Sequence, residues 1–134
     1  MAIQYSTTHR TNAMTQLAAD VGTSAVIKVF TGSPPANCGT ADSGTTLVTF
    51  AGNITQFGTA AAGVLTVSAI ASAVAGAAGV AGYFRVYPTA ATTTNAVMQG
   101  LCGSSGSDMN LTNTNIANGQ TCNFTSMTVT AFGV

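Results

Sequence analysis

A β-branched run followed by a long loop constrains this chain more than any other stretch. Residues 25–30 read AVIKVF, and residues 31–44 continue as TGSPPANCGTADSG. Val, Ile and Phe are typical of strands, and a cluster of Gly, Pro, Asn and Asp ends a strand and begins a loop. The stretch therefore predicts a strand over 25–31 and a long structured loop over 32–44, which leads through an Asp-Ser-Gly turn into the next strand.

A second strand with the same design is predicted at residues 82–88, which read GYFRVYP. Each of the two runs carries one cation among apolar or aromatic neighbours, Lys28 in the first and Arg85 in the second. We expect them to be two central strands of one β-sandwich. The Lys28 side chain is expected to extend past an aromatic edge or to meet a polar partner.

The rest of the chain alternates apolar runs with turn signals. These runs predict further strands at 45–50, 54–57, 63–70, 96–101, 109–111 and 121–132. Residues 71–79 are expected to form a loop or a single helical turn, because alanine favours helix while Gly76 and Gly79 oppose it. Residues 113–120 are expected to be a loop. About eight short strands in one domain predict an all-β fold, a jelly-roll-like β-sandwich over residues 23–134.

Residues 1–22 are predicted to form an extended arm and a short helix. The helix is expected from about Thr8 to Val21, with a hydroxyl cap at residues 6–8 and Gly22 as its stop. Its apolar face follows helical spacing and comprises Ala13, Met14, Leu17, Ala18 and Val21. This face either covers the sandwich or, together with the arm, grips a neighbouring subunit.

Charge is unusually scarce, and this restricts the partners. Charged residues make up 4% of the chain and the formal net charge is zero, against about 25% charged residues in ordinary soluble domains. Such a surface favours self-association or docking on another protein. Nucleic acid is not expected as a partner, because neutralising phosphates requires a basic patch. A membrane is not expected either, since the uncharged stretch 60–82 is mostly Ala and Gly.

The polar residues predict neither catalysis nor a metal or other cofactor. His9, the only histidine, has Thr, Arg and Asn as sequence neighbours and lacks a positioned partner for acid–base work. The three carboxylates, Asp20, Asp42 and Asp108, are interpreted as turn or helix-end residues. The odd set Cys38, Cys102 and Cys122 has no CxxC pair and is interpreted as free thiols, with a bridge between Cys102 and Cys122 as the alternative.

Three stretches together resemble a group of small structural proteins of tailed bacteriophage virions. They are AVIKVFTGSPPANCGTADSGTTL at 25–47, GYFRVY at 82–87 and NGQTCNF at 118–124. Members of the group begin with a short N-terminal helix, continue with an AVLKI-x-TG-x-PPA strand and loop, and later carry a G-x-FR-[IV]-Y strand. The likeness spans most of the chain, and the Ala-rich stretch 60–79 departs from it.

The resemblance implies a capsid cement, or decoration, protein. Such a protein is made in the host cytoplasm, binds the outer surface of the head as a homodimer or homotrimer, and bridges major capsid protein subunits. We expect the contacts to come from the arm, the helix and the long loop, through Ile3, Tyr5, Met14, Leu17, Pro34 and Pro35. The alternatives are a phage neck or tail component and a secreted β-sandwich adhesin or carbohydrate-binding module.

Overall fold

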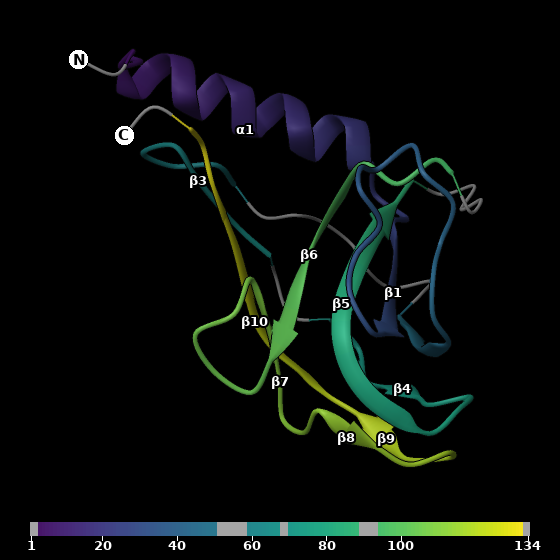
Figure 1. The fold of residues 1–134 in the computed structure, drawn as a ribbon. Helices are drawn as coiled ribbons and strands as arrows, with labels where there is room; N and C mark the ends of the chain where they lie inside the picture. Colours follow the sequence, from purple (N-terminus) through teal and green to yellow (C-terminus); the bar gives the residue numbers. More distant parts are fainter. Residues whose placement is uncertain (1–2, 51–58, 68–69, 89–93, 133–134) are drawn as a thin grey trace.

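The computed structural model describes residues 3–50, 59–67, 70–88 and 94–132. Within these residues the protein is all-β with one N-terminal helix (Figure 1). The elements are, in order, α1 (Thr7–Val21), β1 (Val26–Thr31), β2 (Thr46–Phe50), β3 (Val64–Thr66), β4 (Ala73–Val74), β5 (Gly79–Tyr87), β6 (Met98–Gly103), β7 (Met109–Leu111), β8 (Asn115–Ile116), β9 (Thr121–Cys122) and β10 (Phe124–Thr130).

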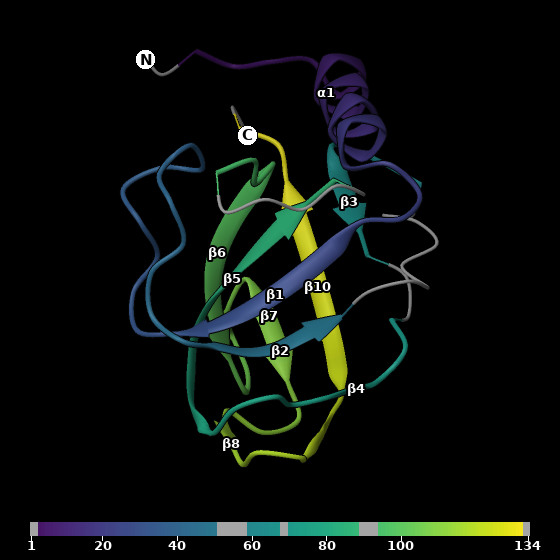
Figure 2. The ribbon, with the colours of Figure 1, turned by 90° about the vertical axis from the view of Figure 1, so that its right-hand side faces the viewer.

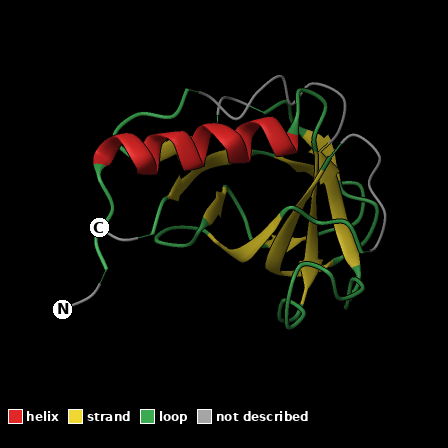
Figure 3. Cartoon of the chain, turned by 90° about the horizontal axis from the view of Figure 1, so that it is seen from above, coloured by secondary structure: helices red, strands yellow, loops and turns green. Residues whose placement is uncertain are grey.

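Helix α1 begins and ends as its sequence predicts. The Ser6 hydroxyl accepts the His9 N–H at 3.2 Å, which caps the first turn. At the other end Gly22 has φ 76°, and its N–H donates to the Ala18 carbonyl. The helix lies across the end of the sheet that also holds the C-terminal end of β10 (Figures 1 and 3). It buries Met14 and Val21 and contacts β3, so its apolar face covers the core of its own chain.

One curled sheet forms most of the molecule. Its eight strands follow the order β2-β1-β5-β6-β7-β10-β3, with β8 paired to β5, while β4 and β9 form a separate pair. All pairings between these strands are antiparallel except β6 with β7. Figure 2 shows β1 and β2 crossing in front of β10, because the sheet curls back on itself. The all-β class with an N-terminal helix is confirmed, and the jelly-roll-like arrangement of the strands stays a prediction.

The core fills the inside of the curl. It combines buried side chains of the first strands with those of the last, among them Ile27, Val29, Leu47, Phe84, Val86, Leu65, Met109, Leu111 and Met127. Ala25, Ile27 and Val29 are all fully buried, because alternate residues of an extended chain point to the same face of a sheet. Burying a side chain of this size stabilises the fold by about 1.5–3 kcal/mol, so this shared core holds the two halves of the sheet together.

Several predicted elements need correction. Residues 71–79 contain the strand β4 instead of a helical turn, because Ala73 and Val74 pair with Cys122 and Thr121. Residues 113–120 include the strand β8, which pairs with the start of β5 and buries Ile116.

The predicted last strand, 121–132, is two strands. It is interrupted at Asn123, whose carbonyl accepts the N–H and the hydroxyl of Thr112. The predicted strand 63–70 shortens to Val64–Thr66, and residues 68–69 of it lie outside the described residues, as does the whole predicted strand 54–57.

Candidate functional site

The two strands with a central cation are neighbours in the sheet. β1 and β5 pair antiparallel, with Lys28 opposite Arg85 and Phe30 opposite Tyr83. Side chains that face each other across a ladder share one face of the sheet, so both cations lie on the outer face, away from the core. Like charges directly opposite each other destabilise a sheet, so each cation needs a partner of its own.

Arg85 finds its partners in the loop that follows β1. The side chain is fully buried. Its Nη1 donates to Asp42 Oδ1 at 2.6 Å and to the Thr40 carbonyl at 2.9 Å. Its Nη2 donates to the carbonyls of Asn37 and Cys38 at 3.2 and 2.7 Å. A single guanidinium therefore fixes the course of residues 37–42 over the outer face of the sheet.

Two tyrosines on the same face of β5 hold the far side of the loop. The Tyr83 hydroxyl donates to the Ser43 carbonyl and accepts the Ser43 N–H at 3.1 Å. The Tyr87 hydroxyl donates to Asp42 Oδ1. Burial first, and then the hydrogen bond to the Asp42 carboxylate, raises the pKa of Tyr87 well above its ordinary value. Tyr87 thus stays protonated and keeps donating to the loop across the physiological pH range.

Lys28 is accommodated without a carboxylate. Its Nζ lies 4.8 Å from the centroid of the Tyr87 ring, which is within the range of a cation–π contact. Lys28 was expected to extend past an aromatic edge or to meet a polar partner, and it instead lies over the face of an aromatic ring. Next to it, the rings of Phe30 and Tyr83 stack with centroids 4.8 Å apart. The outer face of β1 and β5 is therefore a second, smaller packed layer beneath the loop.

The loop is closed at its neck. The Thr31 N–H donates to the Thr45 carbonyl at 3.0 Å, and the Thr45 N–H donates to the Thr31 hydroxyl at 2.9 Å. Gly44 has φ 73°, and a Cβ there would lie 2.3 Å from the Thr31 carbonyl oxygen. We define residues 32–44, closed at this neck and held by Arg85 and the tyrosines, as the clamped loop.

The clamped loop carries two of the predicted contact residues. Pro34 and Pro35 are half-buried, and the Pro35 carbonyl accepts from Gln99 Nε2 of β6 at 2.7 Å. The two prolines therefore have a fixed position relative to the sheet while part of their surface stays accessible. The contact between this loop and β6 is not predicted by the sequence.

The N-terminal arm carries the other two exposed contact residues. Ile3 is 76% exposed and Tyr5 37% exposed. Tyr5 stacks on His9 with ring centroids 5.1 Å apart and meets Phe132 edge-on at 5.3 Å. Phe132, just past the end of β10, is itself 63% exposed. The sequence singled out Ile3 and Tyr5 but gave no sign of Phe132, because the two ends of the chain come together only in the fold.

The helix residues predicted to make contacts are corrected by their burial. Met14 is 7% exposed and belongs to the core. Leu17 is half-buried and packs against the same core. A side chain that fills its own core is not available to a partner, so Met14 is removed from the predicted contact residues, and Ile3, Tyr5, Leu17, Pro34 and Pro35 stay a prediction.

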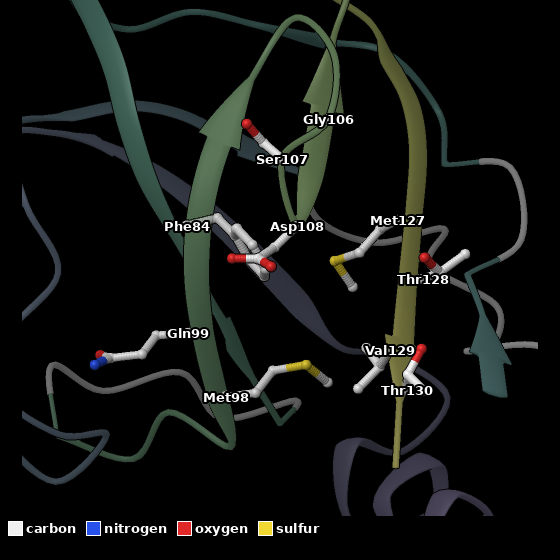
Figure 4. Close-up of a pocket in the computed structure, with 10 residues that line it drawn as sticks. All are labelled: Phe84, Met98, Gln99, Gly106, Ser107, Asp108, Met127, Thr128, Val129 and Thr130. Atoms are coloured by element: carbon white, nitrogen blue, oxygen red, sulfur yellow. The ribbon is translucent and has the colours of Figure 1, made fainter. Parts of the chain in front are cut away.

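The His, Cys and Asp side chains of the described residues do not gather into one site. No group of three His, Cys, Asp or Glu residues in the described part of the chain could hold a metal ion. Asp42 is used by the clamped loop, and Asp108 Oδ2 accepts the Leu101 N–H at 2.9 Å. A cavity of about 520 Å³ between β6 and β10 contains Asp108 as its single ionisable residue, among mainly apolar and hydroxyl side chains (Figure 4). The arrangement suits contact with another molecule and contains no acid–base pair.

All three cysteines are free thiols, so the bridge between Cys102 and Cys122 is not formed. Burial, and secondly the negative charge of Asp108, raises the pKa of Cys102 to about 12. Burial also raises the pKa of Cys122. Cys102 and Cys38 are both half-exposed. The thiolate is the reactive form, so the raised pKa values keep Cys102 and Cys122 in the less reactive thiol form.

We expect Cys102 of the native protein to react with iodoacetamide at pH 8 about 100- to 1,000-fold more slowly than the same cysteine in urea, because so little of it is ionised. Peptide mass spectrometry over a time course measures both rates. The unfolded thiol ionises first as the pH rises from about 9 towards 12, so the free energy of unfolding should fall over that window. Equal rates of alkylation in the native and the denatured protein would contradict the raised pKa of Cys102.

No helix among the described residues is both long and apolar enough to cross a bilayer. Comparison with known proteins returns no family model, no curated protein and no solved structure that matches the chain.

Proposed function

We propose that this protein is a capsid cement protein of a tailed bacteriophage, which binds the outer surface of the head and bridges major capsid protein subunits. The proposal takes its partner from the resemblance of residues 25–47, 82–87 and 118–124 to small virion proteins. It takes its mode of action from the surface of the fold. Binding only the assembled shell stabilises that shell by mass action.

The observation that carries the proposal is the clamped loop. Two of the three stretches that resemble small virion proteins contact each other here. Residues 25–47 contain the clamped loop, and residues 82–87 contain Arg85 and the two tyrosines that hold it. A surface that is already ordered loses little conformational entropy when it binds. The cation and the carboxylate inside the clamp neutralise each other, and interface cores are depleted of charged residues. A rigid, uncharged loop is therefore suited to repeated contact with a shell.

The exposed apolar cluster at the chain ends supports the same mode of action. Ile3, Tyr5 and Phe132 are exposed, Tyr5 meets Phe132 edge-on, and Ile3 lies two residues before Tyr5. Figure 1 shows the start of α1 and the end of β10 at the same end of the molecule. Aromatic residues are enriched in protein interfaces. On a chain with 4% charged residues, such a cluster promotes association with another protein surface.

The proposal is tested by adding the purified protein to heads that lack it. We expect saturable binding over the whole head surface and a higher temperature of shell dissociation. Phe132→Asp should weaken binding at least about tenfold, which corresponds to about 1.4 kcal/mol. Val74→Asp is the matched control, because Val74 is a 65% exposed apolar residue of β4, at the other end of the molecule (Figure 1).

Absence of binding together with unchanged head stability would contradict the cement role. Binding confined to isolated necks or tails would assign the protein to that part of the virion. Binding to a glycan array without any binding to phage particles would favour the adhesin or carbohydrate-binding alternative.

A further inference from the structure

The sheet is incomplete between β6 and β10. β6 pairs with β5 along Met98–Leu101, but on its other side it meets β7 only at Cys102 and Gly103. β10 pairs with β7 only as far as Met127, and its residues 128–130 pair with β3. Among the described strands, none lies between the first half of β6 and the second half of β10. We call the space between these two strand halves the wedge.

The backbone groups on both sides of the wedge point into it. Met127 and Ala131 of β10 bond to the β3 side, through Val67 N–H to Met127 O and Ala131 N–H to Gly63 O. Because hydrogen bonding alternates along an antiparallel strand, Thr128 and Thr130 direct their N–H and C=O groups to the opposite side.

The same alternation holds for β6. The Leu101 N–H is directed away from β5, since it donates to Asp108 Oδ2 at 2.9 Å. Gln99, two residues earlier, therefore presents its backbone groups to the wedge as well. The Asp108 carboxylate replaces a neighbouring strand at one position only. The strand edges at Gln99 and Thr130 thus face each other with donors and acceptors in place for a further strand.

The floor of the wedge is apolar. The cavity of about 520 Å³ lies here, and the side chains of Phe84, Met98, Met127 and Val129 project into it from the core side (Figure 4). Thr128 and Thr130 are exposed on the outer side. An added strand would therefore place every second side chain on an apolar floor and the others in solvent, which is the pattern of a strand in a half-buried sheet.

The chain itself contains a segment with this pattern. The arm reads MAIQYS, with apolar residues at positions 1, 3 and 5 alternating with smaller or polar ones. Ile3 is 76% exposed, so its side chain is free to pack elsewhere. The four residues ahead of Tyr5 span at most about 14 Å when extended. The four residues Met98–Leu101 that form one side of the wedge span about 13 Å, so residues 1–4 are long enough to run along the wedge.

In its own chain the described part of the arm does not lie in the wedge, because Ile3 is 76% exposed. Ser6 caps α1, and Tyr5 is fixed between His9 and Phe132. An arm that inserts into a neighbouring copy can keep these contacts.

We propose that the wedge receives the N-terminal arm of a second copy of this chain, which adds a strand between β6 and β10 and places Ile3 on the floor formed by Phe84, Met98, Met127 and Val129. The exchange is reciprocal, so that two copies form a closed, two-fold symmetric dimer. Addition of a strand to open edges supplies affinity through main-chain hydrogen bonds and specificity through alternate side chains. This inference goes beyond the cement role and does not depend on it.

The test is a cross-link between copies, made without phage heads. Gln4 alternates with Ile3 along the arm, so in the added strand it shares the outer face with Thr128. Gln4→Cys on one preparation is mixed with Thr128→Cys on another, both carrying Cys38→Ser and Cys102→Ser to remove the two half-exposed thiols. After mild oxidation we expect a mixed disulfide that joins the two chains, identified by mass spectrometry. Thr49→Cys is the matched control, because Thr49 is an exposed threonine of β2 at the opposite edge of the sheet, and it should cross-link at least about tenfold less.

Sedimentation of the unmodified chain gives the second readout. We expect a dimer, and Ile3→Asp should raise its dissociation constant at least about tenfold with an unchanged monomer melting temperature, because Ile3 is exposed in the monomer. A monomer at all concentrations would overturn the proposal. So would equal cross-linking to Thr49→Cys, or a disulfide formed within one chain when Gln4→Cys and Thr128→Cys are combined, since that outcome assigns the wedge to the chain's own arm.

Discussion

Replacing Arg85 with methionine should lower the free energy of unfolding by about 3–5 kcal/mol, the usual cost of removing one partner of a buried ion pair. Methionine retains much of the side-chain volume but leaves the Asp42 carboxylate and the loop carbonyls without their cation. The guanidinium donates to four loop acceptors at 2.6–3.2 Å. Urea denaturation measures the loss, and amide hydrogen exchange should show faster exchange across the clamped loop.

Lys28→Met is the matched control for Arg85→Met. Lys28 stands opposite Arg85 in the sheet. Its ammonium makes a cation–π contact with the Tyr87 ring, where Arg85 makes an ion pair with Asp42. A partly exposed cation–π contact contributes about 0.5–1 kcal/mol. If the two variants lost equal stability, the loop would not depend on Arg85, and the main support for a preformed contact surface would be lost.

Replacing Gly82 with alanine should destabilise the protein by about 3 kcal/mol, at the upper end of the cost of overpacking. A Cβ at this position would lie 2.0 Å from the Gly32 carbonyl oxygen and 3.0 Å from the Gly32 N and C atoms. These are backbone atoms of the clamped loop where it leaves β1, so relief requires the loop or β5 to move. Thermal denaturation followed by circular dichroism measures the change.

Gly76→Ala is the matched control for Gly82→Ala. A Cβ on Gly76 meets nothing within 4 Å, so we expect a change within about 0.5 kcal/mol of zero or a small gain from the stiffer unfolded chain. A wild-type melting temperature for Gly82→Ala would show that the loop does not approach β5 closely.

The strands that carry a strong local signal could be predicted from the sequence. Residues 25–31 and 82–88 have dense β-branched and aromatic patterns, and they form β1 and β5. The capping serine and Gly22 set the bounds of α1. Short strands such as β4 and β8 have two residues each, and their pairing depends on distant partners. Propensity in an Ala- and Gly-rich stretch contains no information about such partners.

The clamp could not be predicted from the sequence, although its parts were visible. Lys28 and Arg85 were recognised as the central cations of two strands, and Asp42 was interpreted as a turn residue. That the Arg85 side chain reaches Asp42 follows from the pairing of β1 with β5, which places the loop over the outer face. The pair lies 43 positions apart in sequence, so spacing rules for helices and strands do not apply to it.

Met14 was predicted to contact a partner but is buried in the core of its own chain. Helical spacing placed it correctly on an apolar face, but an apolar face serves a core and an interface equally well. Only the position of α1 across the end of the sheet decides between them.

The central claim is that this fold serves as a repeated contact unit on a phage head. The most direct test is a cryo-EM map of the intact virion of the phage whose genome encodes the chain. The account predicts density for the curled sheet at many equivalent positions on the outer head surface, across boundaries between capsid subunits, with the clamped loop or the N-terminal arm in contact. A head surface without this density, or density confined to the neck or tail, would contradict it.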